Sequence, residues 1–360
     1  MVFMSVNILD AAKNLFCRYE KERGVIDNYF GLLAYYALVQ LAQTGGDQAL
    51  MKKCKDYLSL YPDNFKHPRY NFQLYRIGGV GKAWLFYKGE MPEAKEQVRQ
   101  YAEIMMNSPK NVDGILCHPD FHERVWIDTV CFATPFMLFA GLALNEQRYI
   151  DFAADQCFKS YELFLDRTNG LLHQAKGFLE NKERVSSDYW SRGNGWGYAG
   201  LAELVQHLPA DSSHRQRAIK LFKDHTDAIL EYQCPNGLWK QILNEELAWY
   251  ESSGTALLLY GIGVGIRCGI LEGDQYMEAL RLGIDGLGKC CIGEDYKTFS
   301  SCPGCLCPGT GKEKGTPKAY LVEKRPQDNE PHSFGCMILA LTEAYRNGIT
   351  QIELFVPKKR

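Results

Sequence analysis

The chain has 360 residues, of which 46% are hydrophobic, and its 41 lysines and arginines nearly balance its 43 aspartates and glutamates. This composition excludes a disordered or collagen-like chain and predicts a folded protein with a large core. The net charge of −2 gives no electrostatic reason to expect a nucleic acid or an anionic membrane as partner. The 12% of aromatic residues and the 33 glycines fit either an aromatic core or flat apolar surfaces that bind sugars.

Helix-periodic segments recur along the chain in pairs, each with an apolar helix, a break at glycine, asparagine or proline, and an amphipathic helix. The apolar helices are expected at residues 28–43, 76–88, 126–144, 196–207 and 252–271. Their amphipathic partners are expected at residues 47–58, after Pro92, and at 147–165, 213–232 and 274–287. A sixth pair joins a helix near 333–346 to the amphipathic segment near 7–21, and the clearest strand signal covers 351–357.

The apolar helix of each pair is nearly free of charge, whereas its partner carries lysine, glutamate and aspartate on one face. This asymmetry predicts an inner ring of buried helices inside an outer solvated ring. Joining the two ends of the chain closes the ring and removes the exposed terminal faces of an open solenoid. We therefore expect one all-α domain over residues 1–360, an (α/α)6 barrel of six helical hairpins. The unequal spacing of the breaks disfavours a tetratricopeptide array.

Targeting segments and metal sites are not evident. Residues 1–20 carry four charged side chains among apolar positions, unlike a secretory signal, and the apolar runs are shorter than the roughly 20 residues of a membrane helix. The 13 scattered cysteines favour reduced thiols in a soluble cytoplasmic protein. Cys302, Cys305 and Cys307 form a C-x2-C-x-C segment, but a structural zinc needs a second ligand pair, so no metal is expected.

Asp128 is the only charged residue between Trp126 and Leu144, and it stands at the expected first turn of an inner helix. Apolar surroundings raise the pKa of a carboxyl group, which suits a general acid near neutral pH. The alternative is that Asp128 caps its own helix, a frequent use of aspartate. The aromatic neighbours Trp126 and Phe132 favour a catalytic role.

Residues 188–196 combine two tryptophans, two glycines, an arginine and an asparagine ahead of the fourth inner helix. The glycines permit a tight turn, and Trp190 and Trp196 offer stacking faces. Arg192 and Asn194 offer donors for a carboxylate and for hydroxyl groups. The alternative is a tight turn between helices with packing tryptophans. Nucleotide binding is not expected, because there is no phosphate-loop motif and no preceding strand.

Further polar and aromatic residues stand at or before the starts of other inner helices. They are His173, Trp239, Ser252, Ser253, Thr255 and His332. Taken singly, each histidine is better explained as a satisfied structural residue. Together, groups of this kind at one end of a helical ring predict a saccharide pocket.

The segments WIDTVCFATPF, GLLHQ, YWSRGNGW, NGLW and ESSGTA precede a late GTG…Asp…His segment. In this order they resemble the unsaturated glucuronyl and rhamnogalacturonyl hydrolases of glycoside hydrolase families 88 and 105, and family 105 is the closer. The resemblance runs from about residue 70 onward. It implies an (α/α)6 barrel, in agreement with the hairpin count.

The resemblance implies removal of a terminal 4,5-unsaturated uronic acid from a small lyase-generated oligosaccharide, with rhamnose as the preferred aglycone. One aspartate, here Asp128, protonates C4 and then, as a base, activates water for attack at C5. The positions that line the sugar are His173, Trp190, Arg192, Asn194 and Trp196. Arg192 is implied to bind the uronate carboxylate, a role that the hydroxyls of Ser252, Ser253 and Thr255 can share. No metal or organic cofactor is implied.

Trp126 and His332 complete the expected substrate-binding set, from their places beside Asp128 and at the last inner helix. Family members commonly carry a second aspartate in an L-D-S-I segment, where this chain reads Leu74-Tyr75-Arg76-Ile77. Either this second aspartate is dispensable for the reaction, or the protein has an altered specificity or has lost its activity.

Two other functions stay open. One alternative is an ordinary glycosidase or sugar epimerase on the same barrel. The other is a catalytically silent carbohydrate-binding or interaction scaffold.

Overall fold

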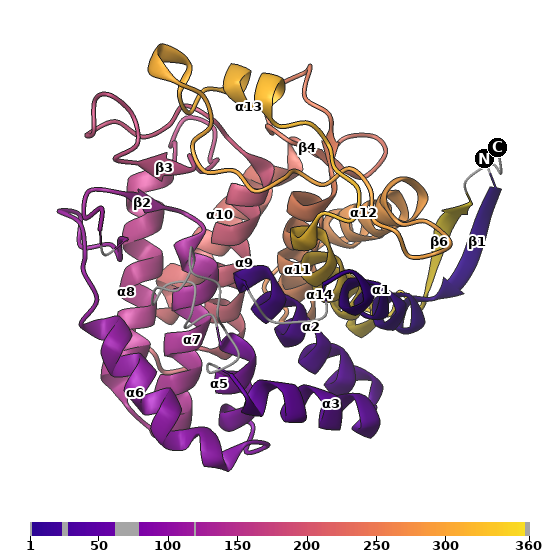
Figure 1. The fold of residues 1–360 in the computed structure, drawn as a ribbon, viewed down its shortest axis with the longest axis horizontal. Helices are drawn as coiled ribbons and strands as arrows, with labels where there is room; N and C mark the ends of the chain where they lie inside the picture. Colours follow the sequence, from indigo (N-terminus) through magenta and orange to yellow (C-terminus); the bar gives the residue numbers. More distant parts are fainter. Residues whose placement is uncertain (1, 24–27, 62–78, 119, 357–360) are drawn as a thin grey trace.

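The computed structural model describes residues 2–23, 28–61, 79–118 and 120–356. Six helices form an inner ring: α2 (Tyr29–Gly45), α5 (Val80–Tyr87), α7 (Thr129–Leu144), α9 (Ser191–His207), α11 (Ser252–Arg267) and α14 (Pro331–Arg346). Six others lie outside it: α1 (Ile8–Arg23), α3 (Gln48–Ser59), α6 (Lys95–Met106), α8 (Gln147–Phe164), α10 (Arg215–Leu230) and α12 (Asp274–Cys291). Each inner helix contacts the next, from α2 through α14 and back to α2, as Figure 1 shows. The described helices therefore form the predicted ring of hairpins.

Local sequence explains where the hairpins turn. Asn145 ends α7 in the left-handed conformation with φ 56°, which asparagine adopts more readily than most residues. Gly46 ends α2 in the same conformation, with φ 63°. The side chain of Asp47 then accepts the backbone N–H of Leu50 at 2.9 Å and so begins α3. The predicted breaks at these positions are confirmed.

The two ends of the chain meet and close the ring. Strand β1 (Val2–Asn7) pairs antiparallel with β6 (Gln351–Val356), and α1 packs against α14. Figure 1 shows this two-stranded ribbon at the edge of the ring, beside α12. The strand predicted near residue 351 is confirmed, whereas β1 was not predicted.

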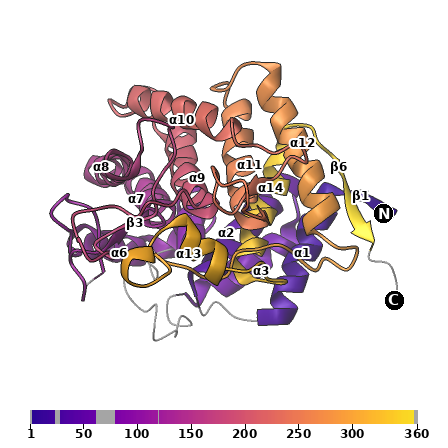
Figure 2. The same cartoon turned by 90° about the horizontal axis from the view of Figure 1, so that it is seen from above.

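Short elements gather near the N-terminal ends of the inner helices. Strand β2 (Val125–Trp126) pairs with β3 (Ala175–Lys176), and β4 (Trp239–Lys240) pairs with β5 (Tyr250–Glu251). Helix α13 (Pro317–Glu323) lies near β3 in Figures 1 and 2. Two single-turn helices, η2 (Pro92–Ala94) and η3 (Gly311–Glu313), complete the described elements. No helix within the described ranges is long and apolar enough to cross a membrane.

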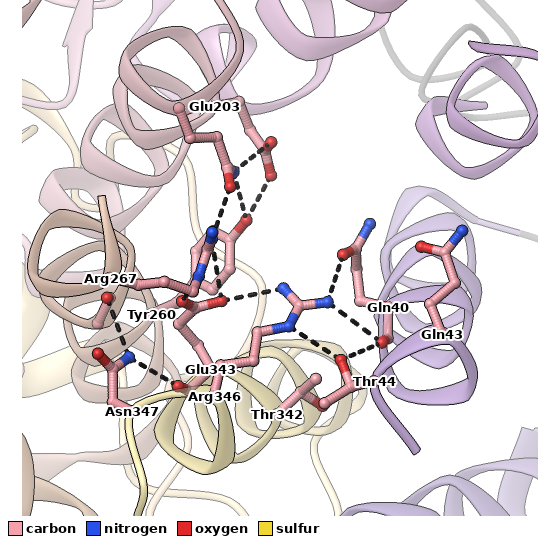
Figure 3. Close-up of polar contacts among 12 residues, drawn as sticks. Gln40, Gln43, Thr44, Glu203, Tyr260, Arg267, Thr342, Glu343, Arg346 and Asn347 are labelled. Atoms are coloured by element: carbon pink, nitrogen blue, oxygen red, sulfur yellow. Dashed lines mark hydrogen bonds and ion pairs between the residues drawn. The ribbon is translucent and has the colours of Figure 1, made fainter. Parts of the chain in front are cut away.

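The opposite end of the ring, where the inner helices finish, holds a buried ionic network (Figure 3). Glu343 of α14 is fully buried and pairs with Arg267 Nε at 2.5 Å and with Arg346 Nη1 at 3.0 Å. Glu203 of α9 accepts the hydroxyl of Tyr260 at 2.5 Å. Because buried charges are costly unless they are paired, this network ties the ends of α9, α11 and α14 together.

Candidate active site

Asp128 stands immediately before α7, where the β2–β3 pairing leads the chain into the helix. Trp126 pairs with Ala175, and the backbone N–H of Ile127 donates to the carbonyl of Gln174 at 2.9 Å. Asp128 is the N-cap residue of α7 by position, but its side chain makes no capping hydrogen bond to the helix. The carboxyl group is therefore available for another role.

The carboxyl group of Asp128 is poised between its charged and neutral forms. Its Oδ2 atom is buried and accepts no hydrogen bond from the residues that the structure describes. Burial raises the pKa of Asp128 to about 7, the charge of Arg192 opposes this rise, and the carboxyl group of Asp188 adds to it. A carboxyl group with this pKa can donate a proton and then accept one at neutral pH.

Asp188 is a second buried carboxylate near Asp128, and sequence analysis assigned it no role. Its Oδ1 accepts the backbone N–H of Trp190 at 3.2 Å. Its backbone carbonyl lies 3.2 Å from Nδ1 of His173. Burial raises the pKa of Asp188 to about 6. The sequence feature that could have identified Asp188 is its position as the first residue of the aromatic segment 188–196. Residues 74–77, where the second aspartate of the family is missing from this sequence, lie outside the described residues.

Arg192 is buried in the first turn of α9, and most of its donors are engaged by the protein. Nη1 donates to the hydroxyl of Ser253 at 2.9 Å and to the carbonyl of Cys302. Nη2 donates to the carbonyl of Pro303 at 3.0 Å. The guanidinium lies over the ring of Trp190, 4.6 Å from its centroid. Arg192 therefore holds a loop against the inner ring, and its Nε has no partner within the described chain.

Close packing of α9 against α11 brings Arg192 and Ser253 together. A Cβ atom at Gly254 would lie 2.5 Å from Ser191 Oγ and 2.7 Å from the backbone nitrogen of Arg192. Only glycine allows this approach without movement of one helix. The glycine of the ESSGTA segment therefore has a packing role.

Glu251 caps α11 and also holds the neighbouring loop. Its carboxylate accepts the backbone N–H groups of Ser253 at 3.0 Å and Gly254 at 2.5 Å. It also accepts the N–H of Cys302 at 2.9 Å. This role was not predicted, although a glutamate directly before Ser-Ser-Gly is a recognisable capping signal.

His332 belongs to a chain of three polar side chains. Its Nδ1 lies 2.8 Å from Glu330 Oε1, and its Nε2 contacts the hydroxyl of Tyr29. Burial lowers the pKa of His332, which favours the neutral ring. The ring also packs edge-on against Trp196. Tyr29 is half-buried at the start of α2, and sequence analysis did not identify it as a site residue.

Asn194 has a structural role that corrects its predicted contact with the sugar. Its Oδ1 accepts the N–H of Leu172 at 2.8 Å, and its Nδ2 donates to the carbonyls of Leu172 at 3.0 Å and Trp190 at 3.1 Å. The amide is thereby saturated by the backbone next to His173. The ring of His173 stacks on Tyr189 at a centroid distance of 4.8 Å, and His173 is half-buried.

The structure buries the predicted tryptophans and gives Thr255 a structural partner, whereas it leaves the hydroxyl of Ser252 unpartnered within the described chain. The tryptophans proposed as sugar platforms are all buried, and they are Trp126, Trp190, Trp196 and Trp239. Trp190, Trp196 and Trp239 belong to the main hydrophobic core, whereas Trp126 packs in a small separate cluster with Ala175 and Cys307. Thr255 Oγ1 accepts the N–H of Trp239 at 2.9 Å and is structural. Ser252 Oγ is buried and has no partner among the described residues.

The three loop cysteines do not share one site. The sulfur atoms of Cys302 and Cys305 lie 3.9 Å apart, whereas Cys307 packs with Trp126 and Ala175. Across the described chain, no three histidine, cysteine, aspartate or glutamate side chains are arranged to hold a metal ion.

A closed ring of helical hairpins with a buried acid at the N-terminal end of an inner helix defines a six-hairpin glycosidase architecture. The chain belongs to glycosyl hydrolase family 88, whose pattern it matches over residues 14–348. The sequence resemblance to that family is confirmed.

Curated relatives match part of the chain. An unsaturated 3S-rhamnoglycuronyl hydrolase from Formosa agariphila is 29% identical over 174 residues, which cover 46% of each protein. The unsaturated rhamnogalacturonyl hydrolase YesR from Bacillus subtilis is 26% identical over 170 residues, or 45% of this chain and 48% of YesR. The matches thus span about half the length of these relatives.

Solved structures match nearly the whole chain. A family 105 glycoside hydrolase from C. acetobutylicum has a TM-score of 0.81 at 18% identity, covering 93% of this chain and 99% of that one. The unsaturated glucuronyl hydrolase from Bacillus sp. GL1 has a TM-score of 0.71 at 14% identity, covering 96% and 97%. These similarities confirm the predicted (α/α)6 fold.

Proposed function

We propose that this protein is a glycoside hydrolase that removes a terminal 4,5-unsaturated uronic acid from a small oligosaccharide made by a polysaccharide lyase. The observation that carries this proposal is the buried carboxyl group of Asp128 at the start of α7, whose Oδ2 has no partner among the described residues. Burial raises its pKa to about 7. Family membership supports the reaction class. The names of the curated relatives support an unsaturated uronyl group linked to rhamnose.

Asp128 acts twice in the proposed reaction. Its protonated form donates a proton to C4 of the enol ether, and positive charge develops at C5 and the ring oxygen. The carboxylate that remains accepts a proton from the water that attacks C5, which restores the acid. The C5 hemiketal then opens to a ketone, and the hemiacetal left at C1 releases the aglycone alcohol. One water is consumed, and no second carboxylate and no cofactor take part.

Recognition of the uronate carboxylate is shared in this proposal. The guanidinium of Arg192 contributes its charge and its unpartnered Nε–H, and the hydroxyl of Ser252 contributes a second buried donor. Both groups belong to the first turns of neighbouring inner helices, α9 and α11. The half-buried rings of Tyr29 and His173 are the proposed contacts for the sugar faces.

The direct test follows the ultraviolet absorbance of the conjugated uronate. Purified protein is mixed with unsaturated rhamnogalacturonan, sulfated rhamnose-containing and glucuronan disaccharides. We expect absorbance to fall with a rhamnose-linked substrate, and Asp128→Asn to slow this fall by roughly 10²–10⁴-fold. The exposed Asp224→Asn is the matched control. A folded protein that consumes none of these substrates overturns the proposal. In D2O, deuterium is expected at C4.

A conventional glycosidase is the second candidate, because Asp188 supplies another buried carboxylate near Asp128. Two carboxylates that flank a glycosidic bond are the usual requirement for that chemistry. Release of a reducing sugar from saturated substrates, with a strict need for Asp188, would favour it. A silent scaffold instead predicts sugar binding that survives Asp128→Asn without turnover in the unsubstituted protein. The single domain over residues 1–360 and the cytoplasmic location stay predictions.

A further inference from the structure

The loop over residues 302–307 is fixed to the active site through its backbone. Arg192 donates to the carbonyls of Cys302 and Pro303, the second at 3.0 Å. Glu251 accepts the N–H of Cys302 at 2.9 Å. A buried cation in the first turn of α9 and a buried carboxylate at the N-cap of α11 therefore hold the same loop residue. Any displacement of Cys302 changes the environment of Arg192.

A second set of contacts holds the other half of the loop. Gln174, directly after His173, donates from Nε2 to the carbonyl of Cys305 at 3.2 Å. Its Oε1 accepts the N–H of Cys307 at 2.9 Å. The Cys-rich loop thus connects two segments that carry site residues, one at Arg192 and the other at His173.

Cys302 and Cys305 form a thiol pair within this loop. They flank Pro303 and Gly304, and their sulfur atoms lie 3.9 Å apart. Cys302 is buried, whereas Cys305 is partly exposed, so Cys305 lies on the solvent side of the pair. Gly304 between them has no Cβ to restrict the backbone. The sulfur atoms of a disulfide lie about 2 Å apart, so these two sulfur atoms must move about 2 Å closer to each other.

The surroundings of Cys302 favour its reactive thiolate. Gln241 Nε2 lies 3.4 Å from the Cys302 sulfur. Although burial opposes ionisation, the hydrogen bond from Cys305 and the charge of Arg192 hold the pKa of the Cys302 thiol below its usual value. Burial raises the pKa of Cys305, which therefore stays a thiol. A thiolate beside a thiol is the arrangement that reacts with an oxidant and then closes to a disulfide.

We propose that Cys302 and Cys305 are a redox-active dithiol, which a peroxide converts into an intramolecular disulfide that displaces the Cys302 carbonyl group from Arg192. The Cys302 thiolate attacks one oxygen of hydrogen peroxide and becomes a sulfenic acid. The O–O bond breaks, and the other oxygen leaves as hydroxide, which gains a proton to become water. The Cys305 thiol then attacks this sulfur, and a second water leaves as the S–S bond forms. Overall, two thiols lose two electrons and two protons, and one peroxide becomes two waters. A thiol reductant reverses the change.

The dithiol chemistry stands independently of the proposed function, whereas its effect on catalysis rests on that function. Loss of one hydrogen bond to the buried charge of Arg192 corresponds to a reduction of roughly tenfold in the turnover of the unsaturated substrate. The reduced protein is the active form, as expected in a reducing compartment.

The chemical test uses Cys307→Ser, because trypsin then releases residues 298–312 with Cys302 and Cys305 as its two cysteines. The reduced, folded protein is treated with hydrogen peroxide, alkylated and digested with trypsin, and the peptide mass is measured by mass spectrometry. We expect a peptide that is lighter by two hydrogen atoms and carries no alkyl group. Addition of Cys305→Ser to this background removes that product. A peptide alkylated at both cysteines, or oxidised to sulfinic acid without a disulfide, overturns the proposal.

The functional test compares turnover before oxidation, after oxidation and after reduction with dithiothreitol. We expect a reversible loss of roughly tenfold in the unsubstituted chain and in Cys307→Ser, and no reversible loss in Cys305→Ser. Cys305→Ala replaces the serine variant if that variant fails to fold by circular dichroism. A disulfide that forms without changing turnover overturns the regulatory part. Lack of turnover by the reduced protein overturns the proposed function, while the peptide mass still decides the dithiol.

Discussion

The Nη1 atom of Arg192 donates to the hydroxyl of Ser253 at 2.9 Å, and this hydrogen bond joins the first turns of α9 and α11. The same guanidinium also binds the carbonyls of Cys302 and Pro303. A planar group with several fixed donors can serve all three acceptors at once. Arg192 therefore determines the relative positions of two inner helices and the loop that covers them.

Arg192→Lys tests this clamp, because lysine keeps the charge but lacks the planar fork. We expect the free energy of unfolding to fall by about 1.5–3 kcal/mol and kcat/KM to fall at least roughly tenfold. Urea denaturation and the absorbance assay measure the two effects. Arg217→Lys, at a side chain that is 54% exposed, is the matched control and should change neither. Unchanged stability in Arg192→Lys would contradict the clamp.

The pH dependence of catalysis should follow Asp128. Burial raises its pKa to about 7, and the proposed reaction begins with the protonated form. We therefore expect kcat/KM to fall as the pH rises through about 7, because the acid is lost. Rates with saturating and limiting substrate across neutral pH provide the measurement. An activity that instead rises through this range and then stays constant would show that only the carboxylate is needed.

The same shift predicts that Asp128 lowers stability at neutral pH. Its pKa is about 7 in the folded chain against the ordinary 3.8, so the folded state retains a proton that the unfolded chain loses. Stability therefore decreases as the pH rises from about 4 to about 7. Asp128→Asn cannot ionise, so its Tm should exceed that of the unsubstituted chain above pH 7 and approach it near pH 4. Equal melting temperatures at both pH values would refute this prediction.

Much of the fold could be predicted because its determinants are local. An inner helix such as α7 is apolar around its whole circumference, and a left-handed Asn145 ends it. Strand β1 could not be predicted in the same way, because its partner β6 lies at the other end of the chain. Strand pairing over such a separation leaves no turn signal in the sequence between the two strands.

In the candidate site, too, the features with local determinants could be predicted, whereas those that depend on distant segments could not. Asp128 was identifiable as a single charge in an apolar segment. Several partners of Arg192 and Asn194 were not, since they are backbone groups of loops elsewhere in the chain, among them Cys302 and Leu172. Tyr29 was missed for a similar reason, because it meets His332 across 303 positions of the sequence.

Gly254→Ala tests the close approach of α9 and α11. The added Cβ would lie 2.5 Å from Ser191 Oγ, so one helix must move. We expect a loss of about 1–3 kcal/mol in the free energy of unfolding, and lower kcat/KM because Arg192 moves with α9. Gly45→Ala is the control, since its Cβ would lie 3.7 Å from Leu9 in ordinary contact. A variant as stable as the control would show that the helices have room to separate.

The ionic network at the far end of the ring should contribute to stability and not to catalysis. Glu343 is fully buried, and its side chain lies between those of Arg267 and Arg346 (Figure 3). Glu343→Gln leaves both cations without their shared anion. We expect the free energy of unfolding to fall by about 3–5 kcal/mol, measured by urea denaturation.

The control for this network is Asp224→Asn, which removes an exposed ion pair to Lys220. It should cost less than about 1 kcal/mol, because solvent screens such a pair. The rate per folded molecule should stay unchanged in Glu343→Gln, since Glu343 lies at the end of the ring opposite Asp128. A loss of activity with unchanged stability would instead connect this network to the active site.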